Sequence, residues 1–255
     1  MKIYELSRQK NIRDIGGLTN FEGKSIKYGL LIRGGYLANI SEEDADIIKA
    51  LHLTDIVDFR GEEEYINKPD YRFEGVSYHN FPVLEMRVNE KDKKKDDANL
   101  FWFLNDHTSG HEHIKDCYHH FTISIVSIKA YKDFFSLLDG KRSIYFHCSQ
   151  GKDRAGFAAY LIEIALGISE EKALNDYLYS NIAMEKRADM MINYLKSQGY
   201  YSEEYKQNLI DVFSAKEEYL YEAINVCNEH YGSVMNFIIN ILEVDINKLR
   251  ELYLS

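Results

Sequence analysis

The segment Ser143–Gly167 reads SIYFHCSQGKDRAGFAAYLIEIALG and restricts the possible folds more than any other part of the chain. An apolar and aromatic run typical of a buried strand leads into a polar loop, and the loop leads into a helix with almost no polar side. A helix that is apolar all round is a buried one. Its N-terminus therefore gives the loop a rigid floor at the end of a strand, which is where α/β sheets place their ligand sites.

Strands and helices alternate along much of the chain. The predicted strands are residues 30–35, 54–60, 76–83 and 143–148. A helix is predicted at 41–53, with Ser41 at its N-cap, and helices fill most of the chain after Gly167. This alternation predicts an α/β fold, with a central, largely parallel sheet flanked by helices and an extended helical C-terminal half. For a chain of 255 residues with two prolines, we expect a single domain, residues 1–255.

Composition excludes several classes of function. A net charge of −10 argues against broad binding to nucleic acid or to an acidic membrane surface, although a local basic pocket needs only a few charges. The N-terminal residues lack the apolar stretch of a secretory signal, and no apolar run is long enough for stable membrane insertion. The three cysteines, Cys117, Cys148 and Cys227, are widely spaced, which favours a reduced, cytoplasmic setting over a disulfide framework. Export without a recognisable signal stays open.

The polar loop HCSQGKDRAG has the composition of an anion cradle. Backbone N–H groups in a strand-to-helix loop can point inward, and the following helix adds its positive end. Gly151 permits a turn with positive φ, and Arg154 supplies a rigid fork of donors for two oxygens of a tetrahedral anion. Cys148 lies at the base of this cradle, where the thiolate, a nucleophile toward phosphorus, is favoured. A nucleotide-binding loop fits poorly, because Asp153 follows Lys152 where such loops carry Ser or Thr.

These residues resemble a known family. His147-Cys148, five residues and Arg154 match the HCx5R signature of cysteine-dependent protein tyrosine phosphatases. The fuller string, HCxxGKDRxG, is similar to bacterial tyrosine phosphatases of the atypical group, some of which act on lipids. Three further segments resemble motifs of that group in the expected order, namely NIRDIGG (11–17), GLLIRGG (29–35) and IVDFRGEEE (56–64). The resemblance implies a metal-independent phosphatase without a cofactor, acting on phosphotyrosine proteins or peptides, with dual-specificity or phosphoinositide activity left open.

The resemblance also assigns roles to residues. Cys148 would form a phosphocysteine, Arg154 would hold the phosphoryl oxygens, and Asp153 would be the general acid that protonates the leaving phenolate. Lys152 would bind additional negative charge. The remaining loop positions expected to contact phosphate are Ser149, Gln150, Gly151 and Ala155.

Other assignments remain open at this point. Asp58, at the end of a predicted strand, and Asp106, four residues after Trp102, are alternative general acids, although a capping or ion-pair role is the more ordinary one for both. The supporting residues expected to brace the site are His147, Arg13, Asp14, Arg33 and Arg60.

One position departs from the family. Ala155 follows Arg154 where these phosphatases usually carry Thr or Ser, whose hydroxyl helps the cysteine to leave. Without it, breakdown of the phosphoenzyme is expected to be slow. A non-catalytic or slow-turnover phosphate-binding pseudophosphatase is therefore the alternative function. A sulfur-transfer loop is a third hypothesis, which the extended GKDR match weakens.

The middle of the chain, residues 85–140, is the least distinctive part. It holds a charged run at 89–99, interpreted as a solvated loop, and an aromatic stretch at 100–121 with five histidines. These histidines lack the i, i+4 pair with a partner Glu that a helical zinc site shows, so no metal is predicted. The aromatic stretch is expected to be either core or a helical insertion that forms a lid over the pocket.

Overall fold

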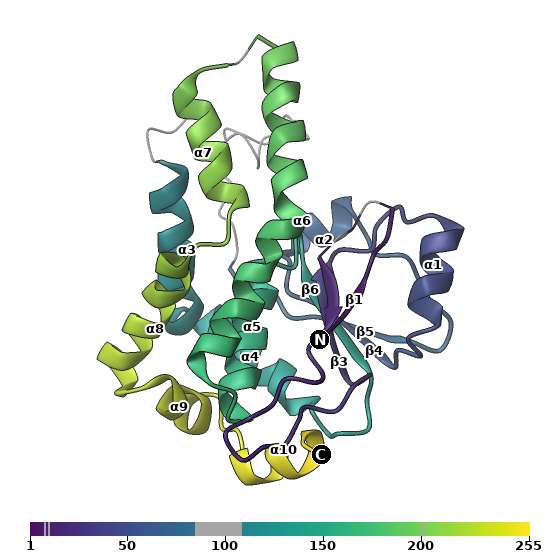
Figure 1. Ribbon diagram of the computed structural model, residues 1–255, viewed down its shortest axis with the longest axis vertical. Helices are drawn as coiled ribbons and strands as arrows, with labels where there is room; N and C mark the ends of the chain where they lie inside the picture. Colours follow the sequence, from purple (N-terminus) through teal and green to yellow (C-terminus); the bar gives the residue numbers. More distant parts are fainter. Residues whose placement is uncertain (8, 10, 85–108, 200) are drawn as a thin grey trace.

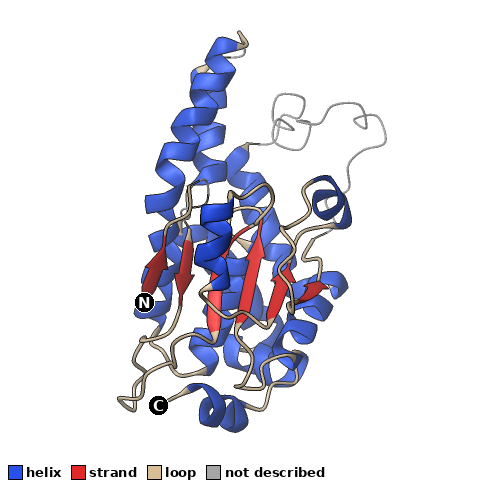
Figure 2. Ribbon diagram, turned by 90° about the vertical axis from the view of Figure 1, so that its right-hand side faces the viewer, coloured by secondary structure: helices blue, strands red, loops and turns tan. Residues whose placement is uncertain are grey.

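The computed structural model describes residues 1–7, 9, 11–84, 109–199 and 201–255. Within them lies a six-stranded sheet with the order β1-β2-β3-β6-β4-β5. The strands are β1 (Lys2–Tyr4), β2 (Ile12–Asp14), β3 (Leu31–Gly35), β4 (Asp55–Asp58), β5 (Ser77–Asn80) and β6 (Ile144–Cys148). The pairs β3–β6, β6–β4 and β4–β5 are parallel, whereas β1 and β2 are added antiparallel at one edge (Figure 2). The predicted α/β fold with a largely parallel sheet is confirmed.

Helices cover both faces of the sheet (Figure 1). They are α1 (Glu42–Lys49), α2 (Glu62–Asn67), α3 (Gly110–Ile123), α4 (Ile125–Ser136), α5 (Arg154–Ala165), α6 (Glu170–Ser197), α7 (Glu203–Phe213), α8 (Glu217–Tyr231), α9 (Val234–Asn236), the π-helix η3 (Phe237–Ile241) and α10 (Ile246–Tyr253). The helical C-terminal half that the sequence predicted is present. The charged run 89–99 and the residues around Trp102 lie outside the described ranges.

Alternation along β6 separates two apolar cores. Ile144, Phe146 and Cys148 face the larger core, which contains α3, α4, α5 and α8. Tyr145 faces a smaller core on the other side of the sheet, where α1 contributes Ala45 and Ile48. Because side chains of a strand point alternately to its two faces, this arrangement places Cys148 against the buried helix α5. The helix follows β6 directly and is buried along nearly its whole length, as its composition predicts.

The far end of the molecule is a helical hairpin. The 28-residue α6 packs against α5 through its first half, and its second half pairs with α7 away from the sheet (Figure 1). This half has its own small core, formed by Met184, Ile192, Leu195, Leu209 and Phe213. Among the described residues, no helix combines the length and apolar character that a membrane crossing requires.

The parallel register brings three strand ends together. Gly35 of β3 pairs with Cys148 of β6, and Asp58 of β4 pairs with His147. The carboxyl ends of parallel strands share one edge of the sheet, so the residues that follow β3, β4 and β6 meet there. The loop 149–153 starts at this edge, in agreement with the position that the sequence predicts.

Candidate active site

The loop after β6 is held from outside by its carbonyl groups. Arg33 Nη2 donates to the carbonyls of Gly151 at 2.9 Å and Lys152 at 3.3 Å, and Asn11 Nδ2 donates to that of Gln150 at 3.0 Å. The backbone N–H groups of residues 149–153 have no hydrogen-bond acceptor among the described residues. A loop whose carbonyl groups are engaged and whose amides lack acceptors has the donors that an anion-binding loop requires.

Two glycines permit this close packing. Gly151 has a φ of +69°, and a Cβ there would lie 2.3 Å from the carbonyl of Gly34. A side chain at position 151 is therefore excluded twice, by its backbone conformation and by the strand beside it. Gly34 in turn has no room for a Cβ, which would lie 2.1 Å from the Tyr145 hydroxyl. The GG pair that ends β3 thus lets the loop fold directly over the sheet edge.

Cys148 is buried, with a relative exposure of 2%, and is the last residue of β6. Its backbone enters the loop whose amides are free, and α5 begins at Arg154 on the other side of the loop. The first turn of a helix presents unpaired N–H groups and a positive partial charge. Negative charge is favoured at such a place.

The guanidinium of Arg154 is fixed by a carboxylate from α2. Arg154 Nη1 donates to Glu64 Oε2 at 2.7 Å and Nη2 donates to Glu64 Oε1 at 3.1 Å, a bidentate pair. Ser149 Oγ accepts from Nη2 at 3.1 Å and donates to the same carboxylate. Burial alone would raise the pKa of Glu64, but the Arg154 cation lowers it to about 2. Glu64 therefore stays ionised and orients the arginine beside Cys148.

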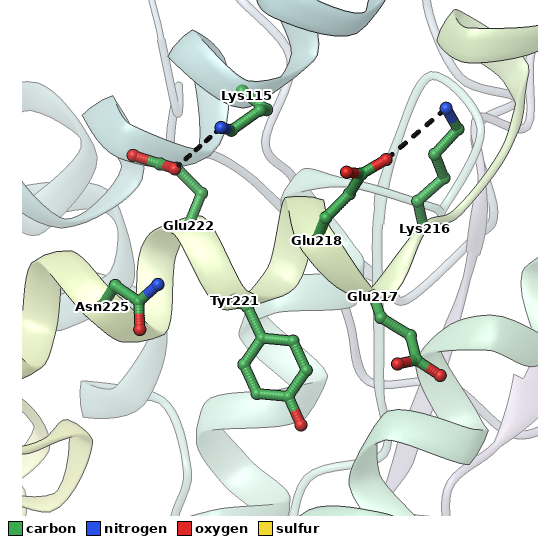
Figure 3. A pocket seen from close by; sticks show the side chains of 7 residues that line it. All are labelled: Lys115, Lys216, Glu217, Glu218, Tyr221, Glu222 and Asn225. Atoms are coloured by element: carbon green, nitrogen blue, oxygen red, sulfur yellow. Dashed lines mark ion pairs between the residues drawn. The ribbon is translucent and has the colours of Figure 1, made fainter.

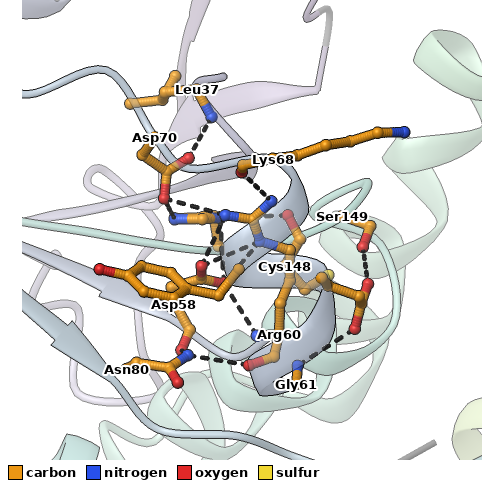
Figure 4. Close-up of polar contacts among 12 residues, drawn as sticks. Leu37, Asp58, Arg60, Gly61, Lys68, Asp70, Asn80, Cys148 and Ser149 are labelled. Carbon is orange, nitrogen blue, oxygen red and sulfur yellow. Dashed lines mark hydrogen bonds and ion pairs between the residues drawn. The ribbon is translucent and has the colours of Figure 1, made fainter.

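A second ion-pair network lies behind Cys148 (Figure 4). Arg60 bonds to both oxygens of Asp58 at 2.7–2.9 Å and reaches Asp70 Oδ2 at 3.2 Å. His147 completes the network, with Nε2 3.0 Å from Asp70 Oδ2 and Nδ1 3.2 Å from the carbonyl oxygen of Cys148. All four side chains are buried, so their charges interact in a poorly screened environment.

The charge state of His147 follows from this network. Burial alone would lower its pKa, but the carboxylates of Asp70 and Asp58 raise the pKa of His147 to about 9. Burial alone would raise the pKa of Asp70, but the charges of His147 and Arg60 lower it to about 2. His147 is an imidazolium at neutral pH, and it places a positive charge directly behind the loop.

Asp153 and Lys152 stand side by side at the end of the loop. Lys152 is buried, and its ammonium donates to the carbonyls of Val212 at 2.8 Å and Ser214 at 3.0 Å, which end α7. It also lies 2.9 Å from Asp153 Oδ1. In this structure Lys152 joins the loop to the α6–α7 hairpin, instead of presenting a free ammonium to a ligand. Asp153 is partly exposed, at 23%, so that its carboxyl group is open to solvent at the end of the loop.

The N-terminal arginines meet on one buried carboxylate. Arg13 Nε lies 2.7 Å from Asp176 Oδ1, and Arg33 Nη1 lies 2.6 Å from Asp176 Oδ2. Arg33 also donates to the loop carbonyls, so Asp176 on α6 supports the loop indirectly, through Arg33. Asp14 lies elsewhere, where its oxygens accept from the amides of Gly16 and Gly29.

The alternative acids differ in their surroundings. Asp58 is 2% exposed and has both oxygens bound by Arg60, a structural ion pair that leaves no oxygen for a leaving group. Asp106 lies outside the described residues. Of the two candidate acids that the structure describes, Asp153 is the more exposed, at 23% against 2% for Asp58. Ala155 is fully buried in the first turn of α5, where its methyl group offers no hydroxyl to Cys148.

One cluster at this site has the residue types of a metal centre, but its other contacts do not suit a metal ion. Asp58, Asp70 and His147 bring ligand atoms close together, and they are the one such group in the part of the chain that the structure describes. Arg60 already lies against both carboxylates, however, and a cation there would meet an arginine and an imidazolium. The donor set fits an ion-pair network and not a metal centre.

A surface hollow of about 580 Å³ lies away from this loop (Figure 3). It is lined by Lys115 of α3 and by residues 216–225 at the start of α8, with ion pairs from Lys115 to Glu222 and from Lys216 to Glu218. It takes no residue from the loop 149–153. Both lysines of its lining are paired with lining glutamates, and the hollow indicates no particular ligand.

Comparison with known proteins agrees with this geometry. A family model described as the tyrosine phosphatase family matches residues 4–255. The chain belongs to the tyrosine phosphatase family. This tyrosine phosphatase is 28% identical over 256 residues to a Cupriavidus necator protein named as a tyrosine-protein phosphatase, covering 96% of this chain and 86% of the relative. It is 25% identical over 280 residues to the triple specificity protein phosphatase PtpB of Mycobacterium tuberculosis, covering both chains in full.

The family assigns the class of reaction. The tyrosine phosphatase is a phosphoric monoester hydrolase, and its substrates are phosphorylated molecules. The resemblance based on the HCxxGKDRxG string is thereby confirmed at the level of the family. The roles of individual residues, and the choice among phosphorylated substrates, remain predictions.

Sequence reasoning missed three carboxylates around the loop. Glu64 lies within the segment IVDFRGEEE, but three successive glutamates gave no reason to choose the one at the third helical position. Asp176 carries a usable signal, because it falls on the buried face of α6 with Ala173, Tyr177 and Ser180. Asp70 follows a turn, and nothing in its local sequence distinguishes it from an exposed loop residue.

Proposed function

We propose that the tyrosine phosphatase hydrolyses phosphotyrosine through a phosphocysteine intermediate on Cys148. The observation that carries this proposal is the pairing of a buried cysteine with a loop whose N–H groups, at 149–153, have no acceptor among the described residues. A bound phosphoryl group would satisfy these donors while its phosphorus faces the sulfur. Attack would form the S–P bond as the bond from phosphorus to the leaving oxygen breaks.

Arg154 would hold two phosphoryl oxygens in both steps. Glu64 occupies the end of its guanidinium through Nη1 and Nη2, and Nε has no partner among the described residues. On the side edge of the fork, Nε is open to an oxyanion, whereas Nη2 also donates to Ser149 Oγ, which a second phosphoryl oxygen would have to replace. His147 adds a buried positive charge behind the loop that would receive the phosphoryl oxyanion.

Asp153 would protonate the leaving phenolate and then accept the proton of the attacking water. Its position beside the loop and its partial exposure support this assignment over Asp58, which Arg60 holds on both oxygens. Dual-specificity or phosphoinositide activity extends the proposal, since one relative is named a triple specificity phosphatase. Because Lys152 is engaged with the end of α7, we rank phosphotyrosine ahead of phosphoinositides.

The alternative is a slow-turnover or non-catalytic phosphate-binding protein, favoured by Ala155. Hydrolysis of p-nitrophenyl phosphate that vanadate inhibits and a chelator does not affect would decide for the enzyme. Parallel assays on a phosphotyrosine peptide and a phosphoinositide panel would then rank the substrates. Activity that persists in Cys148→Ser would eliminate the covalent mechanism.

A further inference from the structure

A buried tyrosine from α3 contacts the carboxyl group beside the loop. The Tyr118 hydroxyl donates to Asp153 Oδ1 at 3.0 Å. Lys152 Nζ lies 2.9 Å from the same oxygen. Oδ1 therefore accepts one hydrogen bond and lies next to a positive charge. No contact to the other oxygen, Oδ2, is found among the described residues.

We propose that Tyr118 is a positioning residue that keeps the acidic proton of Asp153 on Oδ2, the oxygen offered to the leaving group. The inference rests on the proposed role of Asp153 as general acid. A proton on Oδ1 would face the Lys152 ammonium at 2.9 Å and would compete with the hydrogen bond from Tyr118. Protonation is therefore favoured on Oδ2, which has no such neighbours among the described residues.

The surroundings of Tyr118 hold its hydroxyl in place. The side chain is fully buried, and its ring packs against Phe121 at a centroid distance of 4.8 Å and against Tyr219 at 6.2 Å. Its hydroxyl oxygen also lies 2.8 Å from that of Tyr177 on α6. Both Tyr177 and Asp153 Oδ1 lie where the Tyr118 hydroxyl can donate to them, but Tyr118 has a single hydroxyl hydrogen. When that hydrogen is donated to Asp153, the Tyr177 hydroxyl can supply the hydrogen of the contact between the two tyrosines.

Both hydroxyls remain protonated over the working range of pH. Burial raises the pKa of Tyr118 and of Tyr177 well above the ordinary value, and the nearby Asp153 carboxyl adds to the shift in each. Tyr118 therefore keeps the hydroxyl hydrogen that it can donate to Asp153 Oδ1. It does not exchange protons with the substrate, which places it outside the catalytic residues proper.

Asp153 Oδ2 would give up a proton in the first step of the reaction and take one back in the second. As the S–P bond forms and the bond to the leaving oxygen breaks, Oδ2 passes its proton to that oxygen. The negative charge then left on Asp153 is stabilised by the Tyr118 hydroxyl, which donates to Oδ1, and by the nearby Lys152 ammonium. In the second step Oδ2 takes a proton from the water that attacks phosphorus, and the electron pair of the S–P bond returns to Cys148.

The test compares leaving groups of different acidity. A general acid matters most when the leaving phenol is weakly acidic, as in phosphotyrosine with a phenol pKa of about 10. It matters least for p-nitrophenyl phosphate, whose phenolate leaves without a proton. The ratio kcat/KM is the readout, because it covers steps only up to phosphoenzyme formation and ignores slow breakdown caused by Ala155.

We expect Tyr118→Phe to lower kcat/KM on a phosphotyrosine peptide by about tenfold, and on p-nitrophenyl phosphate by less than about twofold. Tyr231→Phe is the matched control, because the Tyr231 hydroxyl bonds to the Thr122 carbonyl of the same helix α3 and has no contact with Asp153. The control should leave the ratio of the two substrates unchanged. Equal losses on both substrates with Tyr118→Phe, or no loss on either, would overturn the inference.

The variant Asp153→Asn distinguishes failure of this inference from failure of the proposal that Asp153 is the general acid. If Asp153→Asn selectively impairs the phosphotyrosine peptide and Tyr118→Phe does not, the acid stands and the role of Tyr118 is refuted. If Asp153→Asn shows no selectivity, both are refuted together. In the Asp153→Asn background, Tyr118→Phe should cause no further change in the substrate ratio, and a full additional loss would contradict a positioning role that acts through Asp153.

Discussion

The buried imidazolium of His147 makes the stability of the protein depend on pH in a defined direction. The histidine is fully buried, with Nε2 3.0 Å from Asp70 Oδ2. Its pKa is lowered by burial but raised more strongly by Asp70 and Asp58, from 6.5 to about 9. A pKa that is higher in the folded state contributes stability that is complete below the unfolded value of 6.5. That contribution is lost as the pH rises through about 9.

The magnitude follows from the size of the shift. A difference of about 2.5 pH units, at about 1.36 kcal/mol per unit, corresponds to about 3 kcal/mol of unfolding free energy. We expect urea denaturation to show a decline of this order between pH 6.5 and 9.5. Most of that decline should be absent in His147→Gln and retained in His230→Gln, which alters an exposed histidine on α8. Equal declines in all three proteins would refute the assignment of an imidazolium at His147.

Three further predictions concern the loop and its supports. Glu64→Gln should lower kcat/KM for p-nitrophenyl phosphate about tenfold, because a neutral amide holds the guanidinium with one acceptor in place of two. The control, Glu63→Gln on the exposed side of α2, should leave kcat/KM unchanged, and equal effects of the two substitutions would argue against the ion pair. Lys152→Met should reduce the unfolding free energy by about 1.5–3 kcal/mol and speed amide hydrogen exchange at the end of α7, and unchanged exchange there would contradict the contact. Ala155→Ser should raise steady-state turnover and shrink a pre-steady-state burst, an idea that fails if neither quantity changes.

The sequence was sufficient for the fold and for the loop because both are specified locally. Alternating strands and helices determined the α/β architecture, and the apolar composition of 155–166 predicted the buried helix α5. Gly151 and Arg154 predicted a tight loop between a strand and a helix from residue types alone, and the structure has such a loop, with a positive φ at Gly151. These features need no knowledge of which distant segments meet.

The carboxylates that organise the site could not be found in the same way. Glu64 reaches Arg154 across 90 positions of the sequence, and Asp176 meets Arg13 across 163. Such pairs depend on how α2 and α6 pack, which periodicity does not determine. The part played by Lys152 was obscured for the same reason, since its partners at the end of α7 are far from it in the sequence. Ionisable residues on buried helical faces, such as Asp176, are the signal to look for.

The covalent intermediate is the central claim, and rapid acid quenching tests it most directly. The protein is mixed with excess p-nitrophenyl phosphate, quenched within the first turnover, and digested for mass spectrometry of the peptide that contains Cys148. We predict a phosphoryl group on the sulfur of Cys148, more abundant than in Ala155→Ser and absent in Cys148→Ser. An unmodified Cys148 during turnover, with Cys148→Ser still hydrolysing the substrate, would contradict the covalent mechanism.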